Sequence, residues 1–439
     1  MTQVLEIRAM RSIAGPALLA AVASGLVLQA ACFSVLPALR PAAHAANPAL
    51  RSGRSSRVSS RRFLPAMNAG DEEGGVTLPP MPKFFSKWDD PNYDPTKDEV
   101  DTDVPLQIAA FEGDVEKMKK LAAEGADINE PNSRGWTALM YACRYRREEA
   151  AKWLLDNGAN ATFSNSFGAT ALMQSAHYGG PTKLLLDYVP KEKIKEYVEQ
   201  RNVFQWTAMH WAGKAGHAQS ARELVAAGAD VEAKNMKGVT PLLEAATGQF
   251  EKNGNQDIVP TLIELGANVN AMSSEGDTPL HSSSYLGFTF SMDLLLKAGA
   301  DPNIVNKAGQ TPVYNAARGG DAEAIELLLK NGGNPNIAEA EGRYPVHEAS
   351  RWGNSEVLEK LIEAGADVNV KDKNGSTPLH ESALWGRAWD DADVTIALIE
   401  AGANRDAKNA EGKTAMEIAL EKMDEEDVED SELIAALKA

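Results

Sequence analysis

Apolar and small residues recur between residues 101 and 424 in paired blocks, and each pair is followed by a polar stretch that contains glycine. The first block holds two adjacent small residues, as in "TPVYNAARGG". The second carries Leu and Ile three and four positions apart, as in "DAEAIELLLKNGG" and "SEVLEKLIEAGA". Side chains at this spacing lie on one face of an α-helix, and glycine is the usual residue beyond a helix C-cap. The pattern therefore predicts pairs of short helices, in which a thin first helix packs closely against its neighbours and the second helix is amphipathic.

The start of each first helix is marked by Thr-Pro-Leu-His or a variant of it. Thr is a good N-cap, and Pro fits the first helical position because its missing N–H would have no partner there. The segments that carry this phrase begin at Gly135, Gly168, Gln205, Gly238, Gly276, Gly309, Gly342, Gly375 and Gly412. Successive starts are 33, 37, 33, 38, 33, 33, 33 and 37 residues apart, and an earlier copy begins at Thr102, 33 residues before Gly135. A second phrase, such as "IELGANVN" or "IEAGADVN", recurs at the end of the units.

Both phrases, together with the 33-residue step, resemble the ankyrin repeat, and ten copies cover residues 101–424. The resemblance implies an all-α ankyrin-repeat solenoid, built from helix–turn–helix units that are joined by hairpins. No single unit can bury its apolar face alone, so neighbouring units are expected to stack into one elongated core. The longer steps place extra residues after the third repeat and, in the fifth and ninth repeats, between the paired helices. Such insertions are either tolerated surface length or functional loops.

Residues 1–45 have the order of a secretory-type signal peptide. Arginines precede a run of 28 residues without charge, between Arg11 and Arg40, and the small-residue phrase "AHA" follows it. A basic region, an apolar region and a small-residue cleavage site are the parts of a cleaved leader. The alternative is that residues 12–39 are retained as a membrane anchor, since a run of this length could span a bilayer.

Two further segments of distinct composition follow the leader. Residues 46–70 are rich in Arg and Ser and contain no acidic residue, which is typical of organelle transit peptides. Residues 71–100 are rich in Pro, Gly and Asp and are expected to form a flexible linker. A signal peptide followed by a transit peptide resembles the bipartite leader of algal plastid proteins, which implies a plastid (chloroplast) location. A mitochondrial presequence, secretion and membrane anchoring are the alternatives.

Charge separates the N-terminal region from the rest of the chain. Residues 1–70 carry eight arginines and one acidic residue, whereas the remainder holds 36 basic and 61 acidic residues. An acidic body repels phosphate backbones, which argues against nucleic acid as a partner. The chain has two cysteines, Cys32 and Cys143, too few for a disulfide framework or a cysteine-based zinc site.

Histidine occupies the last position of Thr-Pro-Leu-His in four repeats, as His210, His281, His347 and His380. The resemblance implies that this histidine links the start of its helix to the backbone of a neighbouring loop. His281 precedes three serines, but adjacent helical residues do not face each other, so a Ser–His nucleophile is not predicted. We therefore expect no catalytic site, cofactor, metal or small-molecule substrate.

The end of the chain offers two further chemical candidates. "GKT" at 412–414 lacks the G-x-x-x-x-G-K spacing of a nucleotide-binding loop, because Ala407 stands five positions before Gly412. Residues 425–439 combine an acidic connection with "SELIAALKA". This last segment is expected to form a helix that caps the array, which needs a polar outer end.

The resemblance implies that variable positions of the first helix and of the hairpin line a concave surface. Repeats two to four concentrate aromatic and basic residues at these positions, and exposed aromatic and Arg residues are typical of binding hot spots. The candidates there, called the aromatic–basic patch below, are Arg134, Trp136, Tyr141, Arg144, Tyr145, Phe167, Gln174, Tyr178, Phe204, Trp206, Trp211 and Lys214. A secondary patch comprises Arg343, Arg351, Trp352, Trp385 and Trp389.

These features predict a non-enzymatic scaffold or adaptor that grips a partner protein in the groove. One alternative is a membrane-tethered scaffold that keeps residues 12–39, and another is an enzyme or an enzyme subunit. The repeats occupy 324 residues, so catalysis would have to take place in the groove itself.

Overall fold

The computed structural model describes residues 102, 104–247, 257–389, 392–422 and 431–438, with only the backbone given at 386–389 and at 422. All of them belong to one compact unit, residues 79–439. The predicted leader, transit segment and linker therefore lie outside the described residues, as do most of the insertion in the fifth repeat and the acidic connection near the C-terminus.

The described chain is a succession of helix pairs. The first helices are α4 (Pro105–Glu112), α6 (Ala138–Arg144), α8 (Ala171–Tyr178), α11 (Ala208–Ala215), α13 (Pro241–Thr247), α15 (Pro279–Leu286), α17 (Pro312–Gly319), α19 (Pro345–Arg351), α21 (Pro378–Trp389) and α23 (Ala415–Lys422). The second helices are α5 (Val115–Ala123), α7 (Glu148–Asp156), α9 (Thr182–Asp187), α12 (Ala218–Ala226), α14 (Ile258–Glu264), α16 (Thr289–Lys297), α18 (Ala322–Lys330), α20 (Ser355–Glu363), α22 (Asp393–Glu400) and α24 (Glu432–Lys438). The insertion after the third repeat forms an additional helix, α10 (Lys191–Val198), which begins after Pro190.

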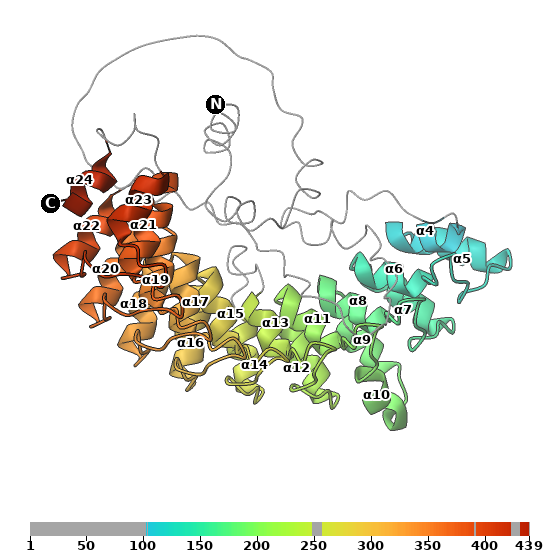
Figure 1. Cartoon of the computed structure of the whole chain (residues 1–439). Coiled ribbons are helices and arrows are strands. Elements are labelled where there is room, and N and C mark those ends of the chain that lie inside the picture. Colours follow the sequence, from blue (N-terminus) through green and yellow to red (C-terminus); the bar gives the residue numbers. More distant parts are fainter. Residues whose placement is uncertain (1–101, 103, 248–256, 390–391, 423–430, 439) are drawn as a thin grey trace, which may run out of the picture. The chain divides into compact units, whose positions relative to one another are not determined.

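First helices pack on first helices and second helices on second helices of the next repeat, so the array has two layers (Figure 1). Within the described ranges no β-strand occurs, and the hairpins contribute a single isolated bridge, between Ser164 and Thr170. The prediction of an all-α solenoid is confirmed.

The first helix begins and ends as its sequence predicts, and α15 is the example. The hydroxyl of Thr278 accepts the main-chain N–H of His281, and Pro279 is the first helical residue. Gly287 ends the helix in the left-handed region, with φ of 64°, which a residue with a Cβ rarely adopts. These local signals fix the helix length and therefore the position at which the chain turns into the second helix.

Close packing between first helices depends on the two adjacent small residues. Ala316 and Ala317 in α17 are completely buried. At the second of these positions α11 carries Gly213, where an added Cβ would lie 2.5 Å from the carbonyl oxygen of Pro241 in α13. The first layer is therefore built from backbones that approach each other over very small side chains.

Asparagines connect successive hairpins along one edge of the array. The side-chain amide of Asn303 donates to the carbonyl oxygen of Gly332 (2.9 Å), and its side-chain oxygen accepts the N–H of Asn334 (2.8 Å). Asn336 makes the same two bonds one repeat further on, to Gly365 and Asp367. These bonds give each repeat a polar connection to the next, in addition to the apolar core.

Candidate protein-binding surface

The four histidines of the Thr-Pro-Leu-His phrase form one repeated hydrogen-bond arrangement. In His281, Nδ1 accepts the N–H of Thr278 (3.2 Å), so Nε2 carries the proton that it donates to the carbonyl oxygen of Gln310 in the next hairpin (3.0 Å). His210, His347 and His380 make the equivalent bonds, each 3.0 Å from Nε2 to a hairpin carbonyl oxygen. These histidines therefore link helix starts to loop backbone, the role that the family resemblance implies.

The surroundings of these histidines keep them neutral. Burial lowers the pKa of each of them, and for His210 it lowers the pKa to about 4. Both ring nitrogens of His281 are bonded to backbone groups, and the neighbouring Ser283 donates its hydroxyl hydrogen to the carbonyl oxygen of Pro279 (3.0 Å). Ser284 is completely buried. The His–Ser sequence in α15 thus serves helix capping and packing.

The aromatic–basic patch is held together by ring and cation contacts across three repeats. The guanidinium carbon of Arg144 in α6 lies 5.5 Å from the ring centre of Trp136 and 5.3 Å from that of Tyr178 in α8. The ring centre of Trp211 in α11 lies 4.7 Å from the ring centre of Trp206, which precedes this helix. The ammonium nitrogen of Lys214 lies 5.4 Å from the centre of the Trp206 ring.

His177 joins the two halves of this patch. Its ring centre lies 4.4 Å from that of Tyr178 and 4.6 Å from that of Trp211. Burial, together with repulsion from Lys214, lowers the pKa of His177 to about 3, so the imidazole is neutral. The position of His177 on the first helix does not by itself reveal this role, because its place between two aromatic residues depends on how the helices stack. The rings and cations from Trp136 to Lys214 thus form one continuous contact chain.

Exposure divides the predicted residues of the patch into two groups. Four of them are less than a tenth exposed, namely Tyr141, Arg144, Tyr145 and Gln174. Half-buried residues are Arg134, Trp136, Tyr178, Phe204, Trp206, Trp211 and Lys214, and Phe167 is 36% exposed. The first group supports the rings of the second group, so the half-buried rings and Phe167 form the part of the patch that a partner could reach.

The hairpin residues of the patch are fixed by bonds between successive hairpins. The hydroxyl of Ser166 donates to the carbonyl oxygen of Arg134 (2.9 Å). The main-chain N–H of Val203 donates to the carbonyl oxygen of Phe167 (3.0 Å). The N–H of Met236 donates to the carbonyl oxygen of Phe204 (3.2 Å). These side chains therefore project from a backbone that is ordered before any partner arrives.

Two polar atoms in the patch have unused hydrogen-bonding capacity. The side-chain oxygen Oε1 of Gln174 in α8 and the indole N–H of Trp211 in α11 are buried and have no hydrogen-bond partner among the described residues. They occupy the same register on neighbouring helices, one as an acceptor and the other as a donor. Such a pair matches the donor and acceptor of a peptide group. Next in this register stands Glu244, whose pKa burial raises to about 7 against the effect of Lys214 and Lys237.

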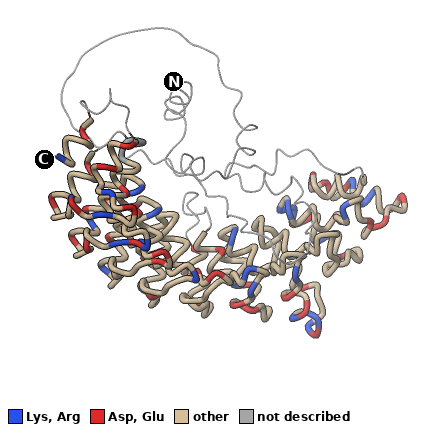
Figure 2. Tube along the Cα trace, in the orientation of Figure 1, with Lys and Arg blue, Asp and Glu red and all other residues tan. Residues whose placement is uncertain are grey.

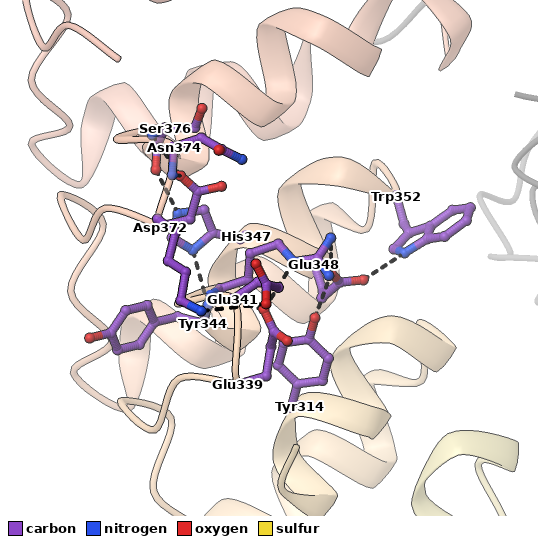
Figure 3. Close-up of polar contacts among 12 residues, drawn as sticks. Tyr314, Glu339, Glu341, Tyr344, His347, Glu348, Trp352, Asp372, Asn374 and Ser376 are labelled. Atoms are coloured by element: carbon purple, nitrogen blue, oxygen red, sulfur yellow. Dashed lines mark hydrogen bonds and ion pairs between the residues drawn. The ribbon is translucent and has the colours of Figure 1, made fainter. Parts of the chain in front are cut away.

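The secondary patch is organised around a carboxylate that the sequence-based candidates did not include. Glu348 in α19 accepts the hydroxyl of Tyr314 (2.8 Å) and the indole N–H of Trp352 (3.0 Å), as Figure 3 shows. Arg343 pairs with Glu339 (3.2 Å), and the Arg351 guanidinium carbon lies 5.1 Å from the Trp385 ring centre. Trp389 ends α21, and its side chain lies outside the described residues. Arg343 and Trp352 are therefore engaged in internal contacts.

Other kinds of site find little support in the described part of the chain. No group of three or more His, Cys, Asp or Glu side chains is arranged there to hold a metal ion, and no helix there has both the length and the apolar character needed to cross a membrane. An open cleft of about 500 Å³ lies at the turns before α9 and α12 and is lined by side chains of both charges. Acidic and basic residues are interspersed along the described array (Figure 2).

Comparison with known proteins identifies the repeats. A family model of ankyrin repeats in three copies matches residues 83–165, 157–235, 232–306 and 285–372, and a second, of ankyrin repeats in many copies, matches residues 361–419.

Individual relatives match over shorter stretches. A mitochondrial disaggregase of Bos taurus is 30% identical over 151 residues, which are 34% of this chain and 22% of the relative. SH3 and multiple ankyrin repeat domains protein 2 of Homo sapiens is 32% identical over 165 residues, 36% of this chain and 8% of the relative. The E3 ubiquitin-protein ligase XBAT33 of Arabidopsis thaliana is 33% identical over 99 residues, 22% of this chain and 19% of the relative. The chain thus spans less than a quarter of the length of each of these proteins.

Proposed function

The chain belongs to the ankyrin-repeat family, and we propose that it is a non-enzymatic scaffold or adaptor that binds a partner protein through the aromatic–basic patch. The family models support a protein-interaction role in general, and the patch supplies the specific surface. Fold alone does not establish function, so the proposal rests on the chemistry of that surface.

The observation that carries the proposal is the continuous row of rings and cations across α6, α8 and α11. Trp, Tyr and Arg are enriched among the residues that dominate binding energy in protein interfaces, and Trp and Tyr bury large areas at a small cost in side-chain entropy. Trp206 and Trp211 are half-buried and in contact at 4.7 Å, so they are preorganised and still retain surface to bury. The contact of Trp211 with His177 continues the row into the preceding repeat.

The test is affinity capture with the wild-type protein and a Trp206→Ala/Trp211→Ala variant, followed by photo-crosslinking from position 167 to locate the partner on the surface. We expect recovery of the partner to fall at least tenfold in the variant. The control is Phe290→Ala, which removes a 39% exposed aromatic side chain from α16 in the second layer. Equal recovery by the double variant, with circular dichroism unchanged, would refute this choice of surface.

Catalysis is the competing function. Two of the relatives are named as enzymes, but the chain spans at most 22% of their length, and their activities are not carried over. The neutral, backbone-bonded histidines support a structural role for the residues that first suggested a nucleophile. Turnover of an ester or phosphoester panel by the purified protein, abolished by His281→Ala in a folded variant, would contradict the non-enzymatic proposal.

For the location we propose an organelle, most specifically a plastid reached through the bipartite leader. The composition of residues 1–70 supports this proposal. N-terminal sequencing of the protein isolated from its cells is the test, and a start between residues 63 and 71 is the expected result. A mature protein that retains residues 12–39 and sediments with membranes would favour the membrane-tethered alternative.

A further inference from the structure

Repeats eight and nine carry the same pair of residues at the same register. Glu348 and Trp352 lie four residues apart at the end of α19, and Glu381 and Trp385 lie four residues apart in α21. Residues at this spacing are neighbours on one helix face, and α19 packs directly on α21. The two pairs therefore stand side by side in the first-helix layer and can be compared group by group.

In repeat eight, Glu348 and Trp352 are hydrogen-bonded to each other. Trp352 donates its indole N–H to Oε2 of Glu348 (3.0 Å), and Tyr314 donates its hydroxyl to Oε1 (2.8 Å). Arg343 adds a guanidinium nitrogen 3.9 Å from Oε1. Glu348 is 4% exposed, so this carboxylate is both buried and fully supplied with donors.

In repeat nine, the corresponding pair, Glu381 and Trp385, does not form this hydrogen bond. The residue that corresponds to Tyr314 is His347, whose two ring nitrogens bond to the backbone of Tyr344 (3.1 Å) and Ser376 (3.0 Å) and so cannot reach Glu381. Oε2 of Glu381 and the indole N–H of Trp385 are both buried and have no hydrogen-bond partner within the described ranges. A buried acceptor and a buried donor thus lie on adjacent turns, each with unused capacity.

The charges around Glu381 leave it incompletely compensated. Burial raises the pKa of Glu381 and outweighs the opposing effect of Arg351, and the charges of Asp372 and Glu348 raise the pKa further. Arg343, the other nearby cation, is already paired with Glu339. A buried carboxylate in this state is stabilised by any further cation that approaches it.

We propose that Glu381 and Trp385 bind a lysine or arginine side chain on an extended segment of a partner protein. The cationic nitrogen donates to Oε2 of Glu381, beside the Trp385 ring, over which the guanidinium of Arg351 already lies (5.1 Å from its carbon to the ring centre). The indole N–H of Trp385 donates to a main-chain carbonyl oxygen of the same segment. This contact lies in repeat nine, five repeats beyond the last repeat of the aromatic–basic patch, uses none of its residues and does not depend on it.

The experiment selects ligands from a random dodecapeptide library displayed on phage, with the full chain as bait, and measures the selected peptides by fluorescence anisotropy. We expect a lysine or arginine at one fixed position of the peptides. Glu381→Gln, which keeps size and removes charge, is expected to weaken binding at least tenfold, and Trp385→Phe at least threefold. The matched control is Glu359→Gln, which removes the same charge from an exposed position in α20 and should leave affinity within twofold.

The peptide supplies a second variant that leaves the protein untouched. Replacing the fixed lysine by norleucine removes the charge and keeps the length of the side chain. This replacement should lower the affinity of the peptide at least tenfold for the wild-type protein and less than twofold for Glu381→Gln. Equal affinities for the lysine and norleucine peptides, or additive losses in this cycle, would overturn the proposal.

Two further outcomes show which of the two surfaces the selected peptides occupy. Peptides that lose binding to Trp206→Ala/Trp211→Ala and not to Glu381→Gln would support the aromatic–basic patch and overturn the second contact. The reverse result would support the second contact, and the aromatic–basic patch would still be judged by its own capture experiment. A synthetic peptide of residues 50–63, which contains five arginines, is included as well. Tight binding that depends on Glu381 for this peptide alone would assign the site to a segment of the chain itself, against the proposed partner.

Discussion

At the scale of single residues, the last position of Thr-Pro-Leu-His shows how one geometric requirement admits different side chains. In repeat one this position is Gln107, whose amide donates to the carbonyl oxygens of Glu130 (2.8 Å) and Trp136 (2.9 Å). It thereby makes the same bridge to the next hairpin that His210 makes through Nε2. Tyr314 occupies the position in repeat seven and reaches Glu348 in the next helix instead. Repeats two, three and five carry Met140, Met173 and Leu243 there, so the position admits apolar residues, and the bridge to the next hairpin forms where imidazole or a carboxamide supplies a donor of suitable length.

This equivalence makes His210→Gln a test of pH dependence. Burial lowers the pKa of His210 from 6.5 to about 4, so between these values the unfolded chain binds a proton that the folded chain does not. The stabilisation is fully present above pH 6.5 and is lost as the pH falls toward 4, by about 3 kcal/mol. Glutamine keeps a donor and does not titrate. We expect urea unfolding midpoints of the two proteins to agree at pH 7.5 and the wild type to lose more stability by pH 4.5. Parallel curves for the two proteins would contradict this assignment.

The burial of individual patch residues shows what the sequence cannot specify. The register of Tyr141, Arg144 and Tyr145 on the first helix follows from the repeat, and with it their place in the first layer. Their exposure of less than a tenth does not follow, because it depends on how the rings of Trp136 and Tyr178 lie over the Arg144 guanidinium. The carboxylate of Glu348 was absent from the candidates for the same reason, since its donors come from two different repeats.

At the scale of helices, start and stop signals in the sequence account for most boundaries. Thr278, Pro279 and Gly287 bound α15 as expected. Repeat nine differs. Its insertion was expected between the paired helices, yet α21 continues to Trp389, through four residues of that insertion. Gly386 stands at the position where glycine ends the first helix of other repeats, as Gly287 does in α15, and it is not among the residues with positive φ, so the helix passes through it. A glycine permits a helix to end and does not compel it.

The approach of α11 to α13 gives a prediction at this scale. Alanine is a better helix former than glycine, so Gly213→Ala would stabilise an isolated helix. Here the new methyl group would meet the carbonyl oxygen of Pro241 at 2.5 Å, and overpacking against backbone costs about 1–3 kcal/mol. We expect a lower thermal midpoint for this variant. Ala246→Gly, at the corresponding position in α13, is the control and should lose about 1 kcal/mol through helix propensity and about 1 kcal/mol more through the loss of a completely buried methyl group. A gain in stability by Gly213→Ala would show that the layer can expand.

At the scale of the whole described array, stability is a sum of local terms. Each helix packs on its partner and on its counterparts in adjacent repeats, and the asparagine bonds likewise join only successive hairpins. In such an array a defect is expected to weaken its neighbours and leave distant repeats unchanged. This organisation also permits two contact surfaces, in repeats two to four and in repeats eight and nine, that act independently.

The end of the array offers the clearest test of this locality. The last helix, α24, packs on α22 and α23, with Leu433, Ile434 and Leu437 at most 5% exposed. Ile434→Ala should cost about 2–4 kcal/mol of local stability, because it leaves a cavity at that interface. Hydrogen exchange measured by mass spectrometry should therefore show faster exchange in α22 and α23 and unchanged exchange in α6 and α8. The control, Lys438→Ala, alters an exposed residue of the same helix and should leave both regions unchanged. Uniformly faster exchange along the array would mean that the repeats unfold as a single cooperative unit, and the two surfaces would then be coupled through global stability.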